Sequence, residues 1–334
     1  RETGAHIEIF CLEPVAPEEY VSMFAVTDRC RWKCIVGNVK RWKNDTLSLY
    51  NPTNNEDVRM MGLKADLIER QGETSIVEFI WADGSPFSRV LELSGSVPIP
   101  PYLNRDTEEI DLERYQTLYA RFRGSVAAPT AGLHFTESVL ERIRAKGIQT
   151  GTVCLHVGAG TFLPVKEQDA TRHPMHTEHF EIQLATLRQL LRKQGLVTAV
   201  GTTSVRTLES LPVLGWRIRQ TGTPSTEQVV GQWESYDIPN DYSGVDVLED
   251  VIGYMRRENL SSLKAATQIM ITPLGFRFRI VKRIITNFHQ PKSTLLLLVS
   301  AYIGDDWRRM YGYALENDFR FLSYGDSSLL ICDK

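Results

Sequence analysis

The chain has 334 residues, 42% of them apolar and 24% charged, a composition typical of a globular protein with room for two domains. A net charge of -3 excludes a basic field over the whole molecule, so any contact with a nucleic acid needs local cationic patches. The five cysteines show no zinc or disulfide spacing, no signal peptide is visible and no apolar run is long enough to span a membrane, so we expect a cytoplasmic protein.

The first part of the chain is rich in short stretches that alternate polar and apolar residues, with turn residues between them. We predict strands at residues 6–12, 32–36, 46–50, 75–80 and 88–93. Short strands separated by turn residues favour a small β-barrel-like domain over residues 1–98.

A local cationic patch lies inside this domain, where Lys40, Arg41 and Lys43 surround Trp42. Cations beside an aromatic ring suit an RNA backbone and a stacked base. An exposed strand end without a ligand is the alternative interpretation.

Residues 98–102 are rich in proline and cannot continue a helix, so we expect them to link to a second domain. Beyond them, strands alternate with helices. Helices are predicted at residues 112–122, 137–146, 185–194, from 204, at 247–257 and at 294–303, and strands at 150–156, 197–201, 268–272 and 283–287. This order predicts an α/β catalytic domain with a mixed sheet over residues 99–334, and Thr136 is expected to cap the second of these helices.

Several histidines and small polar residues follow predicted strands, at the edge where α/β sheets bind ligands. His156 ends one strand and precedes Gly158, Gly160 and Thr161, where glycines allow backbone N–H groups to approach a ligand; a simple tight turn is the alternative. His134 follows a small-residue loop, and His289 with Asn287 ends another strand. These residues are candidates for one shared site.

The segment 173–179 holds three histidines and Glu178. A metal site is one interpretation, but Pro174 breaks the helix that would align the ligands, and no cysteine or aspartate spacing supports zinc. Acid–base or hydrogen-bonding chemistry by His176 and Glu178 is favoured, and loop residues bonded only to the backbone are the third possibility.

A strand-to-helix turn at residues 201–206 carries Gly201, Thr202, Thr203 and Arg206. Free N–H groups at a helix start attract anionic groups, whereas an ordinary N-cap needs no ligand. Arg206 is expected to face the site or to pair with Glu209 one helical turn away. No P-loop lysine, nucleophile elbow or catalytic triad is present.

Six stretches of the sequence, in order, resemble one family. They are residues 124–136, 155–162, 173–178, 201–209, 286–295 and 321–326. They are similar to the motifs of the S-adenosylmethionine:tRNA ribosyltransferase-isomerases of queuosine biosynthesis, the QueA family. The first 95 or so residues resemble the inserted β-barrel domain of that family only loosely.

The resemblance implies a reaction in which the ribosyl part of S-adenosylmethionine is transferred to 7-aminomethyl-7-deazaguanine at the wobble position of a tRNA and isomerised. The product is epoxyqueuosine, and adenine and methionine are released. It also implies S-adenosylmethionine as co-substrate, tRNA as partner, no metal or other cofactor, no membrane contact and a monomeric enzyme.

Given this reaction, we predict roles for residues singled out in the sequence. Acid–base catalysis falls to His134, His156, His176, Glu178 and His289. Substrate binding falls to Thr130, Gly158, Gly160, Thr161, Gly201, Thr202, Thr203, Arg206, Asn287, Tyr324 and Asp326. Contacts with tRNA phosphates are expected from Lys40, Arg41, Lys43, Arg121, Arg123, Lys282 and Arg283.

Within the substrate set, Glu178 or Asp326 would hold the sulfonium, and Arg206 or the turn at Gly201 the carboxylate of the methionine part.

Two features depart from the family pattern. Family members carry an N-terminal segment of the large domain with a Phe-Asn-Asp-Thr motif, which has no counterpart here and is expected to be missing from this sequence. Gln290 also stands where relatives tend to carry Leu. These departures motivate an alternative, a catalytically altered paralogue that binds tRNA without ribosyl transfer.

Overall fold

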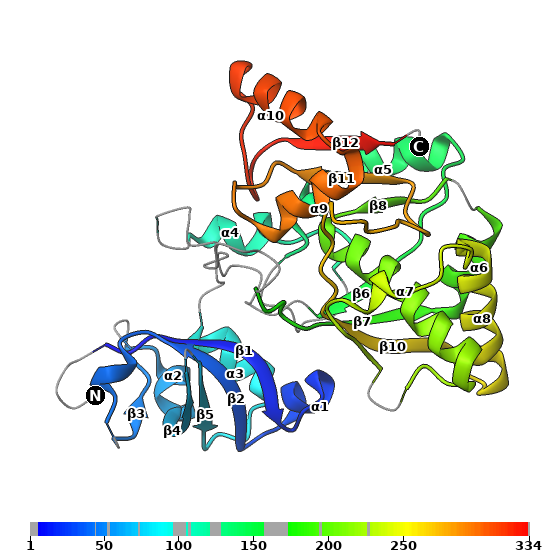
Figure 1. The fold of residues 1–334 in the computed structure, drawn as a ribbon. Coiled ribbons are helices and arrows are strands. Elements are labelled where there is room, and N and C mark those ends of the chain that lie inside the picture. The colour runs from blue at the N-terminus through cyan, green and yellow to red at the C-terminus, as the bar shows by residue number, and fades with distance from the viewer. Residues whose placement is uncertain are drawn as a thin grey trace. The chain divides into compact units, whose positions relative to one another are not determined.

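The computed structural model describes most of the chain (Figure 1). The described residues are 6–43, 45–51, 54–72, 74–95, 105, 108–120, 128–156, 173–193, 196–225 and 228–332. They fall into two compact units, one formed by residues up to 112 together with Ala120, the other by residues 113–119 and those from 128 onward. The predicted link at residues 98–102 lies outside the described residues.

The first unit is built on one antiparallel sheet in the order β1-β2-β5-β4-β3. Its strands are β1 (Ile9–Ala16), β2 (Arg29–Val36), β3 (Leu47–Ser48), β4 (Lys64–Gln71) and β5 (Thr74–Ile80). In the described part of this unit β1 and β3 are the two edges and do not pair with each other, so the sheet is open and the predicted closed barrel is not confirmed.

Short helices pack against this sheet around a core of large side chains. They are α1 (Tyr20–Ala25), η1 (Val39–Arg41), α2 (Glu56–Met61) and α3 (Phe87–Ser94). The rings of Trp32 and Phe87 lie 5.8 Å apart at the centre, and both side chains are fully buried.

The strand predicted at 88–93 is wrong, because these residues belong to α3. Phe87 and Val90 are both buried and stand three residues apart, which is helical and not strand spacing. Leu91 and Leu93 also pack on this core, so the apparent alternation of the segment fits a helix face equally well. Strand β4 and helices α1 and α2 were not predicted.

The second unit contains two mixed sheets, as the α/β pattern predicts. One has the order β6-β7-β10-β9 and is made of β6 (Val153–His156), β7 (Glu178–Gln183), β9 (Val229–Val230) and β10 (Ser262–Thr267). The other has the order β12-β11-β8 and is made of β8 (Thr198–Val200), β11 (Arg283–Asn287) and β12 (Ser327–Ile331). Each contains one parallel pair, β9 with β10 and β8 with β11.

Helices complete this unit (Figure 1). They are α4 (Glu109–Arg114, shared with the first unit), η3 (Thr130–His134), α5 (Glu137–Ala145), α6 (Leu184–Arg192), α7 (Thr202–Thr221), η6 (Glu234–Tyr236), α8 (Gly244–Arg257), α9 (Thr294–Ile303) and α10 (Asp306–Glu316). The Thr136 side chain accepts a hydrogen bond from the N–H of Val139, which confirms the predicted cap of α5. The helix predicted at 112–122 is shorter, since α4 ends at Arg114.

The strand predicted at 268–272 is wrong, because β10 ends at Thr267. The apolar run Ile269, Met270 and Ile271 is nevertheless fully buried, and the N–H of Met270 bonds to the carbonyl of Gln232. A buried apolar run looks the same in the sequence whether or not it joins a regular ladder.

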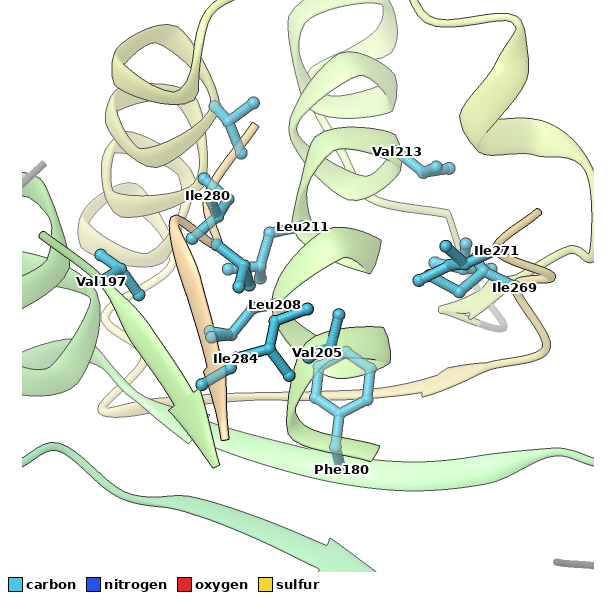
Figure 2. Close-up of a cluster of buried hydrophobic side chains, with 14 of the residues drawn as sticks. Phe180, Val197, Val205, Leu208, Leu211, Val213, Ile269, Ile271, Ile280 and Ile284 are labelled. Atoms are coloured by element: carbon cyan, nitrogen blue, oxygen red, sulfur yellow. The ribbon is translucent and has the colours of Figure 1, made fainter. Parts of the chain in front are cut away.

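Helix α7 is the centre of the second unit, and its buried side chains extend into the core on two sides of the helix (Figure 2). Val205, Leu208 and Leu211 point toward β11 and β7, and Val213 points to the opposite side, toward Ile269 and Ile271. A helix that is buried all round must pair its charged residues internally.

Glu209 of α7 shows how this is done. Its carboxylate, with no exposed surface, accepts hydrogen bonds from the backbone N–H groups of Arg279 at 2.9 Å, Ile280 at 3.0 Å and Val281 at 2.7 Å. These N–H groups belong to the segment that leads into β11. Glu209 therefore fixes the approach to the strand that ends at Asn287.

Among the helices in the described ranges, none combines the length and the apolar character needed to cross a bilayer.

Candidate functional site

The site is organised around the first turn of α7. The backbone turns at Gly201 with a φ of 88°, a conformation that favours glycine. The N–H of Gly201 bonds to the carbonyl of Ile285 at 2.8 Å, which places the helix start beside the end of β11. No described side chain caps this turn, so the N–H groups of Thr202 and Thr203 present the positive end of the helix dipole.

On one side of this turn lies a cluster formed by His176, Glu178, Thr203 and Arg206. Glu178 accepts from Thr203 Oγ1 at 3.3 Å through Oε1 and forms an ion pair with Arg206 Nη1 at 2.6 Å through Oε2. His176 Nε2 lies 3.0 Å from Glu178 Oε1. Arg206 also donates to the carbonyls of His176 and Ile269, both at 3.2 Å.

In this cluster the charge of Glu178 is balanced by the charge of Arg206. Burial raises the pKa of Glu178, but the Arg206 guanidinium and the hydrogen bond from His176 outweigh it, so the net pKa is lowered and the carboxylate stays charged. Burial lowers the pKa of Arg206, partly offset by Glu178. Both members of this ion pair are buried, and both contact His176: Glu178 and Arg206 reach its Nε2, and Arg206 also donates to its carbonyl.

The orientation of His176 determines which ring nitrogen is available. Nε2 lies 3.0 Å from Glu178 Oε1 and 3.2 Å from Arg206 Nη1, which can only donate. In one tautomer Nε2 therefore donates to Glu178 and the lone pair of the neutral ring is on Nδ1, and in the other Nε2 accepts from Arg206. In the described part of the chain, Nδ1 has no hydrogen-bond partner, and 21% of the side chain is exposed. An imidazole with a carboxylate behind it and an open nitrogen in front is arranged as a general base.

His134 is held by Asn287, the last residue of β11. His134 Nε2 lies 2.8 Å from Asn287 Oδ1, and Asn287 Nδ2 donates to Thr130 Oγ1 at 3.2 Å and to the carbonyl of Ser323 at 3.4 Å. Because both protons of the amide have acceptors, its oxygen faces the histidine, and His134 donates from Nε2. The second ring nitrogen of His134 is then an acceptor in the neutral ring.

Close packing surrounds the segment that carries His134. A side chain at Gly132 would overlap the Tyr119 hydroxyl and would lie 2.8 Å from Thr117, which favours glycine in this turn of η3. The neighbouring Ala131 lies 3.7 Å from the position of a Cβ at Gly201. Residue Ala131 of the η3 segment, which also carries His134, therefore packs against the start of α7.

His289 has a different environment. It is buried, its Nε2 lies 2.8 Å from Thr286 Oγ1, and its backbone N–H donates to the Tyr311 hydroxyl at 2.8 Å. Burial lowers the pKa of His289 to about 4, so the ring is neutral near pH 7. Its predicted catalytic role stays a prediction, and the geometry gives it a structural part at the end of β11.

The two predicted residues near the C-terminus lie in a tight turn. Asp326 accepts from the N–H of Arg320 at 2.7 Å, and the N–H of Asp326 returns a bond to the carbonyl of Arg320. The ring of Tyr324 lies 5.8 Å from that of Tyr115. Asp326 thus closes its own turn, and a contact with the sulfonium stays a prediction.

Some predicted residues lie outside what the structure describes. These are the side chain of His156, together with Gly158, Gly160, Thr161, Arg121 and Arg123. The backbone of His156 ends β6 and is paired with His179 of β7.

The histidines of segment 173–179 are not gathered around a point. Glu178 and His179 are consecutive in β7, so they face opposite sides of the strand, and His179 is exposed while Glu178 is buried. Within the described ranges, no group of three or more His, Cys, Asp or Glu side chains is arranged to hold a metal ion.

The predicted phosphate contacts are divided between the two units. Lys40, Arg41 and Lys43 are exposed, as is Lys282, and Arg283 is half-buried in β11. Trp42 has no exposed surface, and its Nε1–H donates to the carbonyl of Asp45 at 2.8 Å. The interpretation of Trp42 as a stacking platform is therefore wrong, because the ring completes the core of the first unit.

Two glutamines that sequence reasoning missed support the site. Gln232 accepts from the N–H of Met175 at 3.0 Å and donates to the carbonyl of His173 at 2.9 Å. Gln268 donates to Thr177 Oγ1 at 2.8 Å. Together they fix the backbone on both sides of His176. No local pattern marks them, because their partners are distant in the sequence.

Comparison with known proteins agrees with the motifs assembled here. The family model described as "Queuosine biosynthesis protein" matches residues 1–330. The S-adenosylmethionine:tRNA ribosyltransferase-isomerase of Trichlorobacter lovleyi is 36% identical over 337 residues, covering 99% of this chain and 79% of the relative. The protein of the same name from Azoarcus sp. is 36% identical over 334 residues, covering 99% of this chain and 77% of its own.

A solved structure of S-adenosylmethionine tRNA ribosyltransferase from Thermotoga maritima is 24% identical, covers 99% of this chain and 76% of that chain, and has a TM-score of 0.39. The family assignment rests on the whole-chain match and on the curated relatives. This chain belongs to the queuosine biosynthesis protein family.

Proposed function

We propose that this chain is an S-adenosylmethionine-dependent tRNA ribosyltransferase-isomerase. It transfers the ribosyl part of S-adenosylmethionine to 7-aminomethyl-7-deazaguanine at the wobble position of a tRNA, isomerises the sugar to give epoxyqueuosine, and releases adenine and methionine. Relatives that share 36% of their residues over 99% of this chain carry the corresponding name. The protein acts in the cytoplasm as a monomer.

The observation that carries the proposal is that two histidines, each held by a side-chain hydrogen bond, belong to segments that contact the start of α7. His176 is backed by Glu178, and His134 is backed by Asn287. The reaction needs a base to remove a proton beside the sulfonium and an acid or hydrogen-bond donor to release adenine. The chain provides two imidazoles, each held through Nε2, that could take these roles.

The different partners of the two histidines divide these roles. His176 contacts the carboxylate of Glu178 through Nε2, and with the proton on Nε2 its Nδ1 can accept a proton from the substrate. Asn287 offers a neutral amide oxygen, which accepts from Nε2 and fixes the ring of His134. We assign His176 as the base and His134 as the group that contacts adenine.

The carboxylate of the methionine part is assigned to the N–H groups at the start of α7. Arg206 is the alternative partner, but its guanidinium is buried and already bonded to Glu178 and to backbone carbonyls. A helix N-terminus binds a carboxylate without a cationic side chain. Thr202 and Thr203 add hydroxyls at the same turn.

The tRNA is held through its phosphates by exposed cations, including Lys40, Arg41, Lys43 and Lys282. The modified base must leave the stack of the anticodon loop to reach the site. S-adenosylmethionine is a co-substrate in this scheme, and the proposed steps use protein side chains without a metal or another cofactor.

The test measures adenine release with S-adenosylmethionine and tRNA that carries 7-aminomethyl-7-deazaguanine. Adenine that forms only with this tRNA, together with the mass gain of the ribosyl-derived group on the base, supports the proposal. His176→Gln should lower the rate by about 10²–10⁴-fold, the range for loss of a general base. His179→Gln is the matched control, since His179 is exposed on the neighbouring strand position, and its rate should equal that of the parent.

Tight binding of the tRNA without adenine release would refute the proposal and favour the altered paralogue. Equal losses in the two glutamine variants would refute the assignment of His176.

A further inference from the structure

Three of the cysteines lie in the first unit, away from the site described above. Cys11 is on β1, and Cys30 and Cys34 are on β2. All three are free thiols. None of them has a part in the proposed reaction.

Cys11 and Cys34 are direct cross-strand partners. In the antiparallel register of β1 and β2, Ile9 faces Val36 and Cys11 faces Cys34. Directly opposed residues of an antiparallel pair have Cα atoms about 4.5–5.5 Å apart. A disulfide needs a Cα separation of about 4.4–6.8 Å, so the backbone already meets this requirement.

The side chains meet on the same face of the sheet. Cys34 has no exposed surface, and Cys11 packs from the edge strand against the same hydrophobic core. A hydrogen bond with Cys11, together with burial, raises the pKa of the Cys34 thiol. The two sulfur atoms are therefore neighbours in the folded protein.

We propose that Cys11 and Cys34 form a redox-active pair that oxidises to a cross-strand disulfide. Cys11 is the entry point, because it is half-buried on an edge strand and an oxidant reaches it first. Cys34 is the resolving thiol, because it is shielded from solvent and faces Cys11.

The oxidant is a small disulfide such as oxidised glutathione. The Cys11 thiolate attacks one sulfur, the glutathione S–S bond breaks, and one reduced glutathione leaves with a proton. The Cys34 thiolate then attacks the Cys11 sulfur of the mixed disulfide and expels the second reduced glutathione. The two protein thiols lose two electrons and two protons, and these convert one oxidised glutathione into two reduced molecules.

Cys30 is close in sequence but unsuited to this bridge. It precedes Cys34 by four positions on the same strand, which corresponds to about 13 Å. Its register partner on the neighbouring strand is Phe79, and the β1–β2 ladder ends at the pair of Ala16 with Arg31. Cys30, which is equally buried, is therefore the matched control.

The disulfide would link β1 to β2, a strand pair whose register is irregular at two places. The register of β1 with β2 shifts between Cys11 and Glu13 and again between Pro14 and Ala16. A covalent link at Cys11 restricts the unfolded chain between the two strands and should raise the thermal midpoint of the first unit.

The test incubates the full chain with oxidised and reduced glutathione at several ratios and digests it with trypsin without reduction. Cleavage after Arg29, Arg31 and Lys33 places Cys11, Cys30 and Cys34 on three separate peptides. A linked pair containing Cys11 and Cys34, an intact mass lower by two hydrogens and a raised thermal midpoint support the proposal. The midpoint should return to its starting value on reduction.

Variants sharpen the result. Cys34→Ala should stop the reaction at a glutathione adduct on Cys11, whereas Cys30→Ala should oxidise like the parent. A pair that contains Cys30, or an unmodified parent protein at every glutathione ratio, would overturn the proposal. The peptide map of the parent chain decides the question even when a variant at a buried position does not fold.

Discussion

His289 provides the sharpest quantitative prediction. Its ring is buried at the end of β11, and burial lowers its pKa from 6.5 to about 4. Between these two values the unfolded chain binds a proton at His289 that the folded chain does not bind. The free energy of unfolding therefore falls as the pH falls through this window, and the contribution is fully present above pH 6.5.

One pKa unit corresponds to about 1.4 kcal/mol, so the shift from 6.5 to about 4 predicts a loss of about 3 kcal/mol from this group alone. We would measure urea unfolding from about pH 7 to about pH 4 for the parent and for His289→Gln. Glutamine keeps a hydrogen-bonding end near Thr286 and does not titrate in this range. Acidic groups titrate in both proteins, so their effects cancel in the difference.

The parent should lose about 3 kcal/mol more than His289→Gln across this range. Parallel pH profiles of the two proteins would refute the reasoning, because they would mean that His289 takes up its proton equally in the folded and unfolded chains. A direct titration of the imidazole by NMR gives an independent value for the same pKa.

Three further changes test other parts of the site. Glu178→Gln should lower the rate of adenine release by about 10²–10⁴-fold and also lower the thermal midpoint, because Arg206 loses its buried counter-charge; an unchanged midpoint would contradict the buried ion pair. Asn287→Leu should slow adenine release by about 10-fold or more while the protein stays folded, because it removes the acceptor of His134; circular dichroism provides the folding control. Glu209→Ala should cost at least about 3 kcal/mol in urea unfolding, since three buried N–H groups lose their acceptor, and a cost below 1 kcal/mol would contradict the three-fold contact.

Local signals in the sequence predict the elements that depend on local physics. The strand at 283–287 has the predicted bounds, the helix predicted to begin at residue 294 does so, and Thr136 caps α5 as its sequence indicates. Apolar periodicity and side-chain capping act within one or two turns, so a short window contains their cause. The α/β class of the second unit follows from the same information.

Contacts between residues that are far apart in the sequence cannot be predicted from such a short window of sequence. His134 and Asn287 are 153 residues apart, and Arg206 bonds with Glu178 instead of its helical neighbour Glu209. Helical spacing favoured the local pair, but Glu209 faces the segment before β11 and Arg206 faces β7. Whether the first sheet closes into a barrel likewise depends on whether its two edge strands pair with each other. The sequence of a single strand does not determine this.

The two buried charges of α7 explain why its first turn suits a site. Arg206 bonds to Glu178 of β7 and to the backbone at Thr267 and Ile269, and so ties the helix to the four-stranded sheet. Glu209, three positions later, bonds to the backbone that enters β11 and ties the same helix to the three-stranded sheet. Removing charge from water is costly, so each tie persists only where ion pairs and hydrogen bonds compensate the buried group. The helix start is thereby fixed against both sheets at once, and Thr203 in its first turn donates to Glu178, the partner of His176. Two polar anchors inside an apolar core therefore position the first turn of α7.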